Sequence, residues 1–325
     1  MKYFISCCIV MSIFLNNTKA QDSTTNSNSV QDTTAPAPSI KKDSVANSTA
    51  QMPAAPNNTS PGSKISSSTF DAKNVYHISW KVDAPVTGVG LGLSVLGLHF
   101  IQNKDSLTAA EANAKSRSDV PAFDRGNAGF YSDKDNNASY IPFFTSFAMP
   151  LVFVVADKTE REQAGQIIVM YTESLAITSA LFTISAGAVQ RSRPLVYPDK
   201  NGNFKAPLDK RESNNSQRSF YAGHTAAAAS ATFFAAKVFS DLHPDSKLKP
   251  YVWIVSAAIP AVTAYYRYES GEHFLSDNIL GYVIGAASGI LVPELHKNKN
   301  FNDHVTISPA LWQDAKGVSI VYSFK

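Results

Sequence analysis

Hydrophobic and polar positions change character several times along this 325-residue chain. A short apolar run, residues 3–15, opens the sequence, and residues 21–72 then contain almost no large apolar side chain. After Trp80 come six apolar stretches whose lengths suit helices better than strands. They cover roughly residues 84–101, 140–156, 166–189, 225–239, 251–266 and 277–295. The pattern predicts an all-α domain with six main helices over residues 73–300.

The N-terminal region predicts export. Lys2 precedes the apolar run, and small residues follow it at Thr18 and Ala20, as in a secretory signal peptide of residues 1–20. The run is shorter than the about 20 residues that a membrane-spanning helix needs. Residues 21–72, rich in Ser, Thr, Asn and Pro, cannot bury enough surface to offset their ordering entropy, so we expect a disordered linker there.

The C-terminal residues 301–325 have a different periodicity. The runs VTISPALW and VSIVYSF alternate or are β-branched, and a turn containing Gly317 separates them. This is the pattern of a β-hairpin. Because two strands alone are marginally stable, we expect the hairpin to pack on the helical domain.

Charge and cysteine usage exclude several classes of function. The formal net charge is +3 and no block of lysines and arginines is present, so nucleic acid is not an expected partner. Cys7 and Cys8 are the only cysteines, and both lie in the expected signal peptide. A mature protein without thiols has no disulfide, cysteine nucleophile or thiolate metal site.

Candidate chemistry lies in three polar clusters, residues 190–199, 218–225 and 265–277. Each sits at the end of an apolar stretch, so a helical bundle could bring them to one face. His273 and Asp277 are four residues apart, where a carboxylate can accept a hydrogen bond from one imidazole nitrogen while the other acts as a nucleophile. Arg193 and Arg267 can form bidentate hydrogen bonds to an oxyanion. Gly223 leaves an unobstructed amide at a helix start.

The order and spacing of these residues resemble the type 2 phosphatidic acid phosphatase (PAP2) and vanadium haloperoxidase superfamily. That family carries a lysine, six residues and Arg-Pro; then Pro-Ser-Gly-His; then Ser-Arg, five residues, His, three residues and Asp. The matching positions are Arg193-Pro194, Gly223-His224, Arg267, His273 and Asp277. The resemblance implies a six-helix PAP2-like bundle.

The resemblance also implies roles. His273 would be the nucleophile that forms a phosphohistidine, His224 would protonate the leaving oxygen, and Asp277 would orient His273. Arg193, Arg267 and the Gly223 amide would hold the phosphoryl oxygens. No metal or other cofactor is implied.

The chain departs from the family pattern at three places. Ala186 stands where the lysine would be, Tyr221-Ala222 replaces Pro-Ser, and Tyr266 replaces the serine before the arginine. These changes remove two phosphate ligands, and one charge-assisted hydrogen bond contributes about 1.5 to 3 kcal/mol. Arg191, two residues before Arg193, is a candidate replacement for the lysine.

We therefore expect a phosphatase for phosphomonoesters or diphosphates, with a phosphorylated lipid or a small phosphoester as substrate. We expect an exported, membrane-associated protein of the cell envelope whose site faces the periplasm. Two alternatives stay open. One is a catalytically idle protein that binds a phospholipid, and the other is a vanadate-dependent haloperoxidase. Glu173, inside the third apolar stretch, is expected to be a buried partner of an arginine.

Overall fold

The computed structural model describes residues 75–298 and the backbone of two strands, residues 305–312 and 315–322. The expected signal peptide (1–20) and linker (21–72) lie outside the described residues and stay predictions. The chain is mostly helical, as expected, and each of the six apolar stretches lies in a long helix. These are α2 (Trp80–Gln102), α4 (Asp133–Ala156), α6 (Ala164–Ala188), α8 (Gly223–Leu242), α9 (Lys249–Glu269) and α10 (Leu275–Leu295).

Short elements fill the connections between the long helices. The polar segment after α2 contains α3 (Ala109–Ala114), which begins with a capping box: the Thr108 side chain accepts from the Glu111 amide, and the Glu111 carboxylate accepts from the Thr108 amide. The other short helices and 3₁₀ turns are η2 (Arg117–Asp119), η3 (Arg125–Asn127), α5 (Lys158–Glu162), η4 (Pro194–Val196), α7 (Leu208–Glu212) and η5 (Asn214–Gln217).

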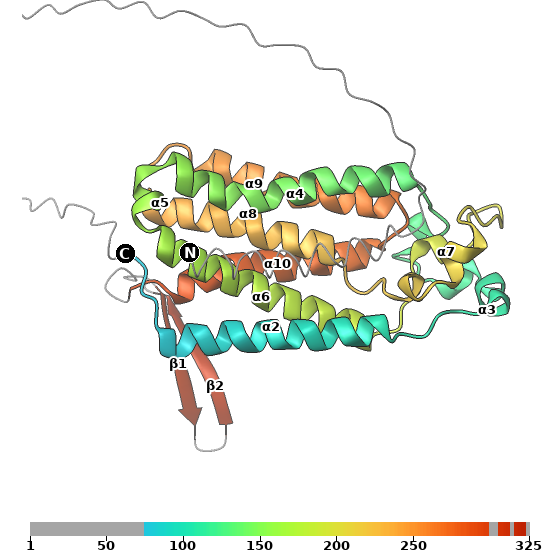
Figure 1. Ribbon diagram of the computed structural model, residues 1–325, viewed down its shortest axis with the longest axis horizontal. Coiled ribbons are helices and arrows are strands. Elements are labelled where there is room, and N and C mark those ends of the chain that lie inside the picture. The colour runs from blue at the N-terminus through green and yellow to red at the C-terminus, as the bar shows by residue number, and fades with distance from the viewer. Residues whose placement is uncertain (1–74, 299–304, 313–314, 323–325) are drawn as a thin grey trace, which may run out of the picture. The chain divides into compact units, whose positions relative to one another are not determined.

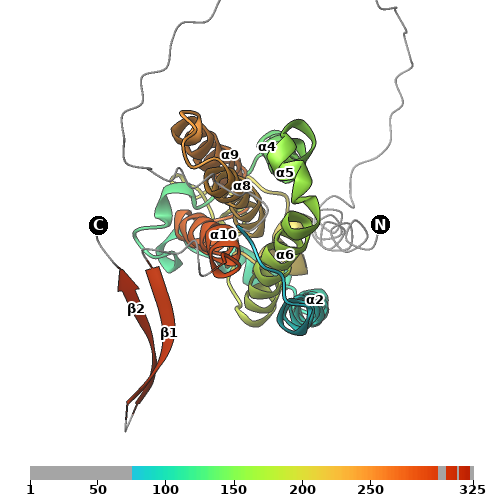
Figure 2. The same ribbon diagram turned by 90° about the vertical axis from the view of Figure 1, so that its left-hand side faces the viewer.

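Helix α8 lies at the centre of the bundle, where it packs against α4, α6, α9 and α10 (Figures 1 and 2). Its alanine-rich sequence is buried almost along its whole length, because small side chains let the neighbouring helices approach closely. Helix α2 packs along α6 at the side of the bundle (Figure 2).

Glycines of α10 allow the closest of these approaches. A Cβ atom at Gly285 would lie 2.0 Å from the Ala226 carbonyl oxygen, and one at Gly281 would lie 2.5 Å from the Ala222 oxygen. Larger side chains would force α8 and α10 apart. The contact fixes the start of α8, which carries His224, against the start of α10, which carries Asp277.

The C-terminal part of the expected fold class is not supported. Strands β1 (Val305–Trp312) and β2 (Ala315–Tyr322) pair antiparallel. The side chains of this segment lie outside the described residues, so no packing of a hairpin on the helical domain is found. The hairpin as a folded part of the domain stays a prediction.

Four helices are long and apolar enough to cross a membrane: α2, α4, α6 and α10. All four also leave large apolar side chains exposed, including Val89 on α2, Ile141 on α4, Leu181 on α6 and Val283 on α10. Such a surface is costly in water and suits lipid. These helices fit association with a membrane.

Candidate active site

The three polar clusters of the sequence meet at one end of the helical bundle, the end beside α3 and α7 (Figure 1). Main-chain hydrogen bonds join them. The Arg193 amide donates to the Ser216 oxygen at 2.8 Å, and the Ala222 amide donates to the Asp277 oxygen at 3.1 Å. Segments that lie up to about a hundred residues apart in sequence thus form one site.

Arg193 and Arg267 converge on a single carboxylate. Both guanidinium groups are buried, and both pair with Glu272; Arg267 Nη2 lies 2.9 Å from Glu272 Oε2. Arg267 Nη1 also donates to Asn136 Oδ1 of α4 at 2.5 Å. Two arginines that pair with one carboxylate can also donate hydrogen bonds to the oxygens of a phosphoryl group.

His273 is buried beside these arginines and has a defined tautomer. Its Nδ1 lies 2.7 Å from the Ser219 carbonyl oxygen, so Nδ1 carries the hydrogen and donates it. The other nitrogen, Nε2, is then the unprotonated one in the neutral ring. Burial, followed by the charges of Arg267 and Arg193, lowers the pKa of His273 well below its usual range. The neutral, nucleophilic form is therefore favoured.

Asp277 acts on His273 indirectly. No hydrogen bond joins the two side chains in the described part of the chain, unlike the direct contact that their spacing suggests. Instead, Asp277 Oδ2 accepts from Ser219 Oγ at 2.6 Å and from the Phe274 amide at 3.0 Å. The α-helical turn directs the carboxylate back to its own N-terminus, and Ser219 connects it to the imidazole.

Arg191 lies on the same carboxylate. Its guanidinium pairs with Asp277 and with Asp124, and it donates to Ser276 Oγ at 3.0 Å. Its carbon lies 4.7 Å from the Phe274 ring centre. Because two carboxylates engage this guanidinium, its geometry fits a positioning residue better than the phosphate ligand expected from the sequence.

His224 and Gly223 lie in the first turn of α8. His224 is buried against two rings of α4, with centroid distances of 4.7 Å to Phe143 and 5.5 Å to Tyr140. Within residues 75–298, His224 Nε2 makes no hydrogen bond. A Cβ at Gly223 would lie 2.6 Å from the Phe182 ring, so a glycine is needed for this close packing. The first amides of α8 have no partner inside the helix and can donate to an anion.

Residues 167–301 match the family model of the PAP2 superfamily. This region of the chain belongs to that superfamily. Its members are generally phosphatases or related hydrolases, so the match identifies the general class of activity. No curated protein and no solved structure matches the chain. The matched region contains all three polar clusters and leaves α2 and α4 outside it.

Two cations that the sequence interpretation missed lie near the arginines of the PAP2 site. Lys104 follows α2, and its Nζ donates to the Ala186 and Val189 oxygens, each at 2.6 Å. Burial, with Arg218 and Arg193 nearby, lowers the pKa of Lys104 to about 8. Burial and Arg267 lower the pKa of Arg218 to about 10. Arg218 was visible inside the second cluster, whereas Lys104 has no local signal because it lies 82 residues before Ala186.

Glu272, Asp124 and Asn127 were also missed. Asp124 accepts from the Ser276 amide at 2.9 Å and from the Ser276 hydroxyl at 2.7 Å. Asn127 donates to the Tyr268 and His273 oxygens at 3.0 and 2.9 Å. The connection between α2 and α4, which looked like a polar linker, therefore holds the turn that carries His273.

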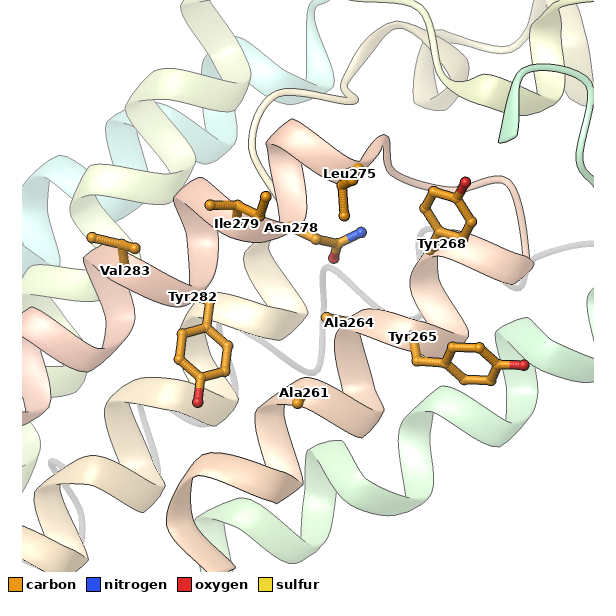
Figure 3. A pocket seen from close by; sticks show the side chains of 9 residues that line it. All are labelled: Ala261, Ala264, Tyr265, Tyr268, Leu275, Asn278, Ile279, Tyr282 and Val283. Atoms are coloured by element: carbon orange, nitrogen blue, oxygen red, sulfur yellow. The ribbon is translucent and has the colours of Figure 1, made fainter. Parts of the chain in front are cut away.

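An apolar groove of about 410 Å³ lies between α9 and α10, next to the PAP2 site. Figure 3 shows Leu275, Asn278 and Ile279 of α10 facing it from one side and residues of α9 from the other. Asn278 follows Asp277 directly, and its Oδ1 lies 2.8 Å from Thr225 Oγ1, in the residue after His224. The groove thus begins at the end of α10 that carries Asp277, next to the start of α8.

Proposed function

We propose that the protein is a phosphatase that hydrolyses phosphomonoesters or diphosphates of lipids through a phosphohistidine intermediate. The observation that carries the proposal is the convergence of Arg193 and Arg267 on one buried anionic position beside His273. A phosphoryl group at that position would replace the Glu272 carboxylate. Charge stabilisation by such fixed cations is the main requirement of phosphoryl transfer.

In the first step, His273 Nε2 attacks phosphorus and forms an N–P bond while the bond from phosphorus to the leaving oxygen breaks. His224, in its protonated form, gives its proton to that oxygen, so the alcohol or phosphate leaves with the proton. Burial and the charges of Arg267, Arg193 and Arg218 lower the pKa of His224, so the negative charge of the bound phosphate is needed to keep it protonated. In the second step, a water molecule attacks phosphorus and gives a proton to His224 as the N–P bond breaks. Inorganic phosphate leaves, and both histidines return to their starting states.

We assign positioning roles around this pair. Ser219 holds the His273 ring through its carbonyl oxygen and contacts Asp277 through its hydroxyl. Arg191 and Asp124 hold Asp277 and the start of α10 in turn. The carboxylate would stabilise the tautomer of His273 through this chain of contacts instead of through direct contact.

Lys104 is proposed to replace the lysine that Ala186 lacks. Its ammonium lies against the carbonyl of Ala186 itself and is close enough to Arg193 and Arg218 for their charges to lower its pKa. An ammonium in this position would add a positive charge near the phosphoryl oxygens from the segment that follows α2. The loss at Ala186 is thereby offset.

The lipid part of the proposal rests on the groove between α9 and α10. Its lining is almost entirely apolar and it lies beside Asp277, so an acyl or isoprenoid chain can lie there while the phosphate reaches His273. Helix α10, which lines one side of the groove, is one of the four helices that fit a membrane, and this supports the entry of such a chain from lipid. The proposed location is the cell envelope, with the site facing the periplasm.

The test is turnover and trapping with the purified protein in detergent. The substrates are phosphatidate, an isoprenyl diphosphate and a soluble phosphomonoester. Covalently bound phosphate is measured on the protein after acid and after base treatment, and a phosphohistidine is expected to be lost in acid and kept in base. We expect lipid substrates to be preferred and the label to be lost in His273→Ala. Undiminished turnover in that variant would refute the mechanism.

A second test addresses the groove and the two rival functions. Ala264→Trp should raise KM for the lipid but not for the soluble ester, because the new ring fills the groove and leaves the phosphate site untouched. Binding of phosphatidate without any turnover would support the idle lipid-binding protein. Halide oxidation that depends on added vanadate would support the haloperoxidase.

A further inference from the structure

The end of the bundle away from the PAP2 site holds a buried cluster of three possible metal ligands. Asp83 lies in the first turn of α2, Glu173 in α6, and His296 at the C-terminal end of α10. Each offers one ligand atom, and these atoms lie within 4.8 Å of one another. Glu173 is about 22 Å along α6 from its last residue, Ala188, so this cluster is separate from the proposed active site.

The surroundings orient the cluster as they orient the ligands of known metal sites. His296 Nδ1 donates to the Val292 oxygen at 2.7 Å, so Nε2 of the neutral ring carries the free electron pair and faces the two carboxylates. Asp83 Oδ2 accepts from the Ser79 amide at 2.7 Å, which leaves Oδ1 toward His296. Such outer contacts fix the tautomer and orientation of metal ligands.

Two atoms of the cluster point independently to a ligand. Glu173, 6% exposed, keeps Oε2 without a hydrogen bond in residues 75–298, and the same holds for His296 Nε2. The sequence predicted that Glu173 would pair with an arginine. In the structure its neighbour is His296 instead. Nε2 lies 3.3 Å from Asp83 Oδ1 and 3.5 Å from Glu173 Oε2.

Those separations are long for charge-assisted hydrogen bonds, which measure about 2.7 to 2.9 Å. They are close to the about 3.3 Å that separates two ligand atoms bound tetrahedrally to one zinc ion, given metal bonds of about 2.0 to 2.1 Å. The two distances from His296 Nε2 to the carboxylate oxygens therefore match a pair of ligands on one metal ion better than they match a hydrogen bond.

We propose that Asp83, Glu173 and His296 bind a divalent first-row transition metal ion, with Zn²⁺ the best match. One imidazole with two carboxylates suits such ions, whereas Ca²⁺ and Mg²⁺ prefer oxygen ligands throughout. The two carboxylate charges balance the ion in a buried position. A bound ion would link the start of α2, the middle of α6 and the end of α10. Its role would be structural.

The experiment uses the full chain in detergent, stripped with a chelator, dialysed and reloaded with ZnCl₂. Bound zinc is measured by mass spectrometry, and the midpoint of thermal unfolding is followed as zinc is added. We expect one bound ion per chain and a midpoint that rises with zinc concentration, because the ion binds only the folded state. Glu173→Gln and His296→Gln should lose the bound zinc.

His243→Gln is the matched control. His243 Nε2 also lies 3.3 Å from a carboxylate oxygen, that of Asp157, but in the described part of the chain it faces no second acid. This variant should keep its zinc. If the cluster variants do not fold, X-ray absorption of the zinc-loaded wild type must show one imidazole and oxygen ligands. A wild-type protein that holds no zinc, or cluster variants that hold as much as wild type, would overturn the proposal.

Discussion

The two ends of the helical bundle differ in how their buried charges are paired. At the PAP2 end, burial and the charges of neighbouring arginines lower the pKa of Lys104, Arg193 and Arg218, and Glu272 pairs with Arg193 and Arg267. Positive charge gathered in a buried place is costly without an anion. The cations at this end therefore favour an anionic ligand, as the proposed function requires.

At the other end, beside the cluster of Asp83, Glu173 and His296, four further charged side chains form ion pairs with one another. Lys237 Nζ lies 2.5 Å from Asp241 and 2.6 Å from Glu294, while Lys297 Nζ lies 2.7 Å from Asp241 and 3.1 Å from Glu294. Each of the two lysines thus forms ion pairs with both carboxylates, and the four charges sum to zero. We infer that this end contributes stability while the PAP2 end gives up stability for binding, and the following variants test that contrast.

The largest effect is expected at His273. His273→Ala should lower kcat by about 10⁴-fold or more, because positioning alone cannot replace a nucleophile in a covalent mechanism. Steady-state release of phosphate measures it. The control His99→Ala changes an exposed histidine of α2 and should keep full activity. A loss of less than tenfold at His273 would mean that another group attacks phosphorus.

Asp277→Asn should have the next largest effect, a fall in kcat of about 100-fold. The amide oxygen can still accept from Ser219 Oγ. The negative charge that pairs with Arg191 is lost, however, and with it the stabilisation that reaches His273 through Ser219. Ser219→Ala, which keeps the carbonyl contact, should cost less than Asp277→Asn when phosphate release is measured. A reversed order, with folding checked by circular dichroism, would contradict the indirect link.

Lys104→Met should lower kcat/KM by about tenfold, the effect of one charge-assisted contact. In the wild type, kcat/KM should also fall as pH rises through about 8, because Lys104 is charged and attracts phosphate only below its pKa. This alkaline limb should be absent from the variant, whereas Lys81→Met, which changes an exposed lysine of α2, should retain it.

The role of Lys104 can be sharpened by moving the ammonium. Ala186→Lys alone should lower activity or stability, because Ala186 is fully buried and a second ammonium would meet Lys104 there. In the Lys104→Met background the same change should restore part of kcat/KM. A double variant no better than Lys104→Met would refute the equivalence of the two positions.

Glu272→Gln should shift binding in the opposite direction by a smaller amount. Removal of the competing carboxylate should tighten inhibition by inorganic phosphate about three- to tenfold, a gain of about 1 kcal/mol. Without phosphate the variant should unfold more easily, because Arg193 and Arg267 lose their compensating charge. Glu269→Gln, which forms no ion pair in the described residues, is the control for inhibition kinetics. Weaker phosphate inhibition would show that Glu272 supports the phosphate site.

The smallest effect on turnover is expected at the end with the Lys237 ion pairs. Lys237→Met should lower the free energy of unfolding by about 2 to 3 kcal/mol, less than a fully broken buried pair because Lys297 still contacts both carboxylates. Its kcat should stay within about twofold of wild type, since Lys237 lies about 20 Å along α8 from His224. Denaturant unfolding and phosphate release together measure the two values. A loss of turnover comparable to that of Lys104→Met would remove the contrast between the ends.

Local features of the sequence determined most of the fold and the outline of the site. The six apolar stretches predicted the long helices because helix formation depends on short-range periodicity. The spacing of His273 and Asp277 placed both at the start of the last long helix, where His273 precedes α10 and Asp277 lies in its first turn. The order of the three clusters led to the PAP2 superfamily, which the family match confirmed. Arg193 and Arg267 likewise lie where their motifs predict.

Tertiary packing decided which side chains meet, and this could not be predicted from spacing. Lys104 reaches Ala186 because α2 packs on α6, and Asp124 reaches the start of α10 because the α2–α4 connection folds over it. Asp277 contacts Ser219 instead of His273, since a four-residue spacing fixes the helix face but not the partner that another segment brings to it. Each of these contacts joins residues more than fifty positions apart, where local propensity carries no information about distance.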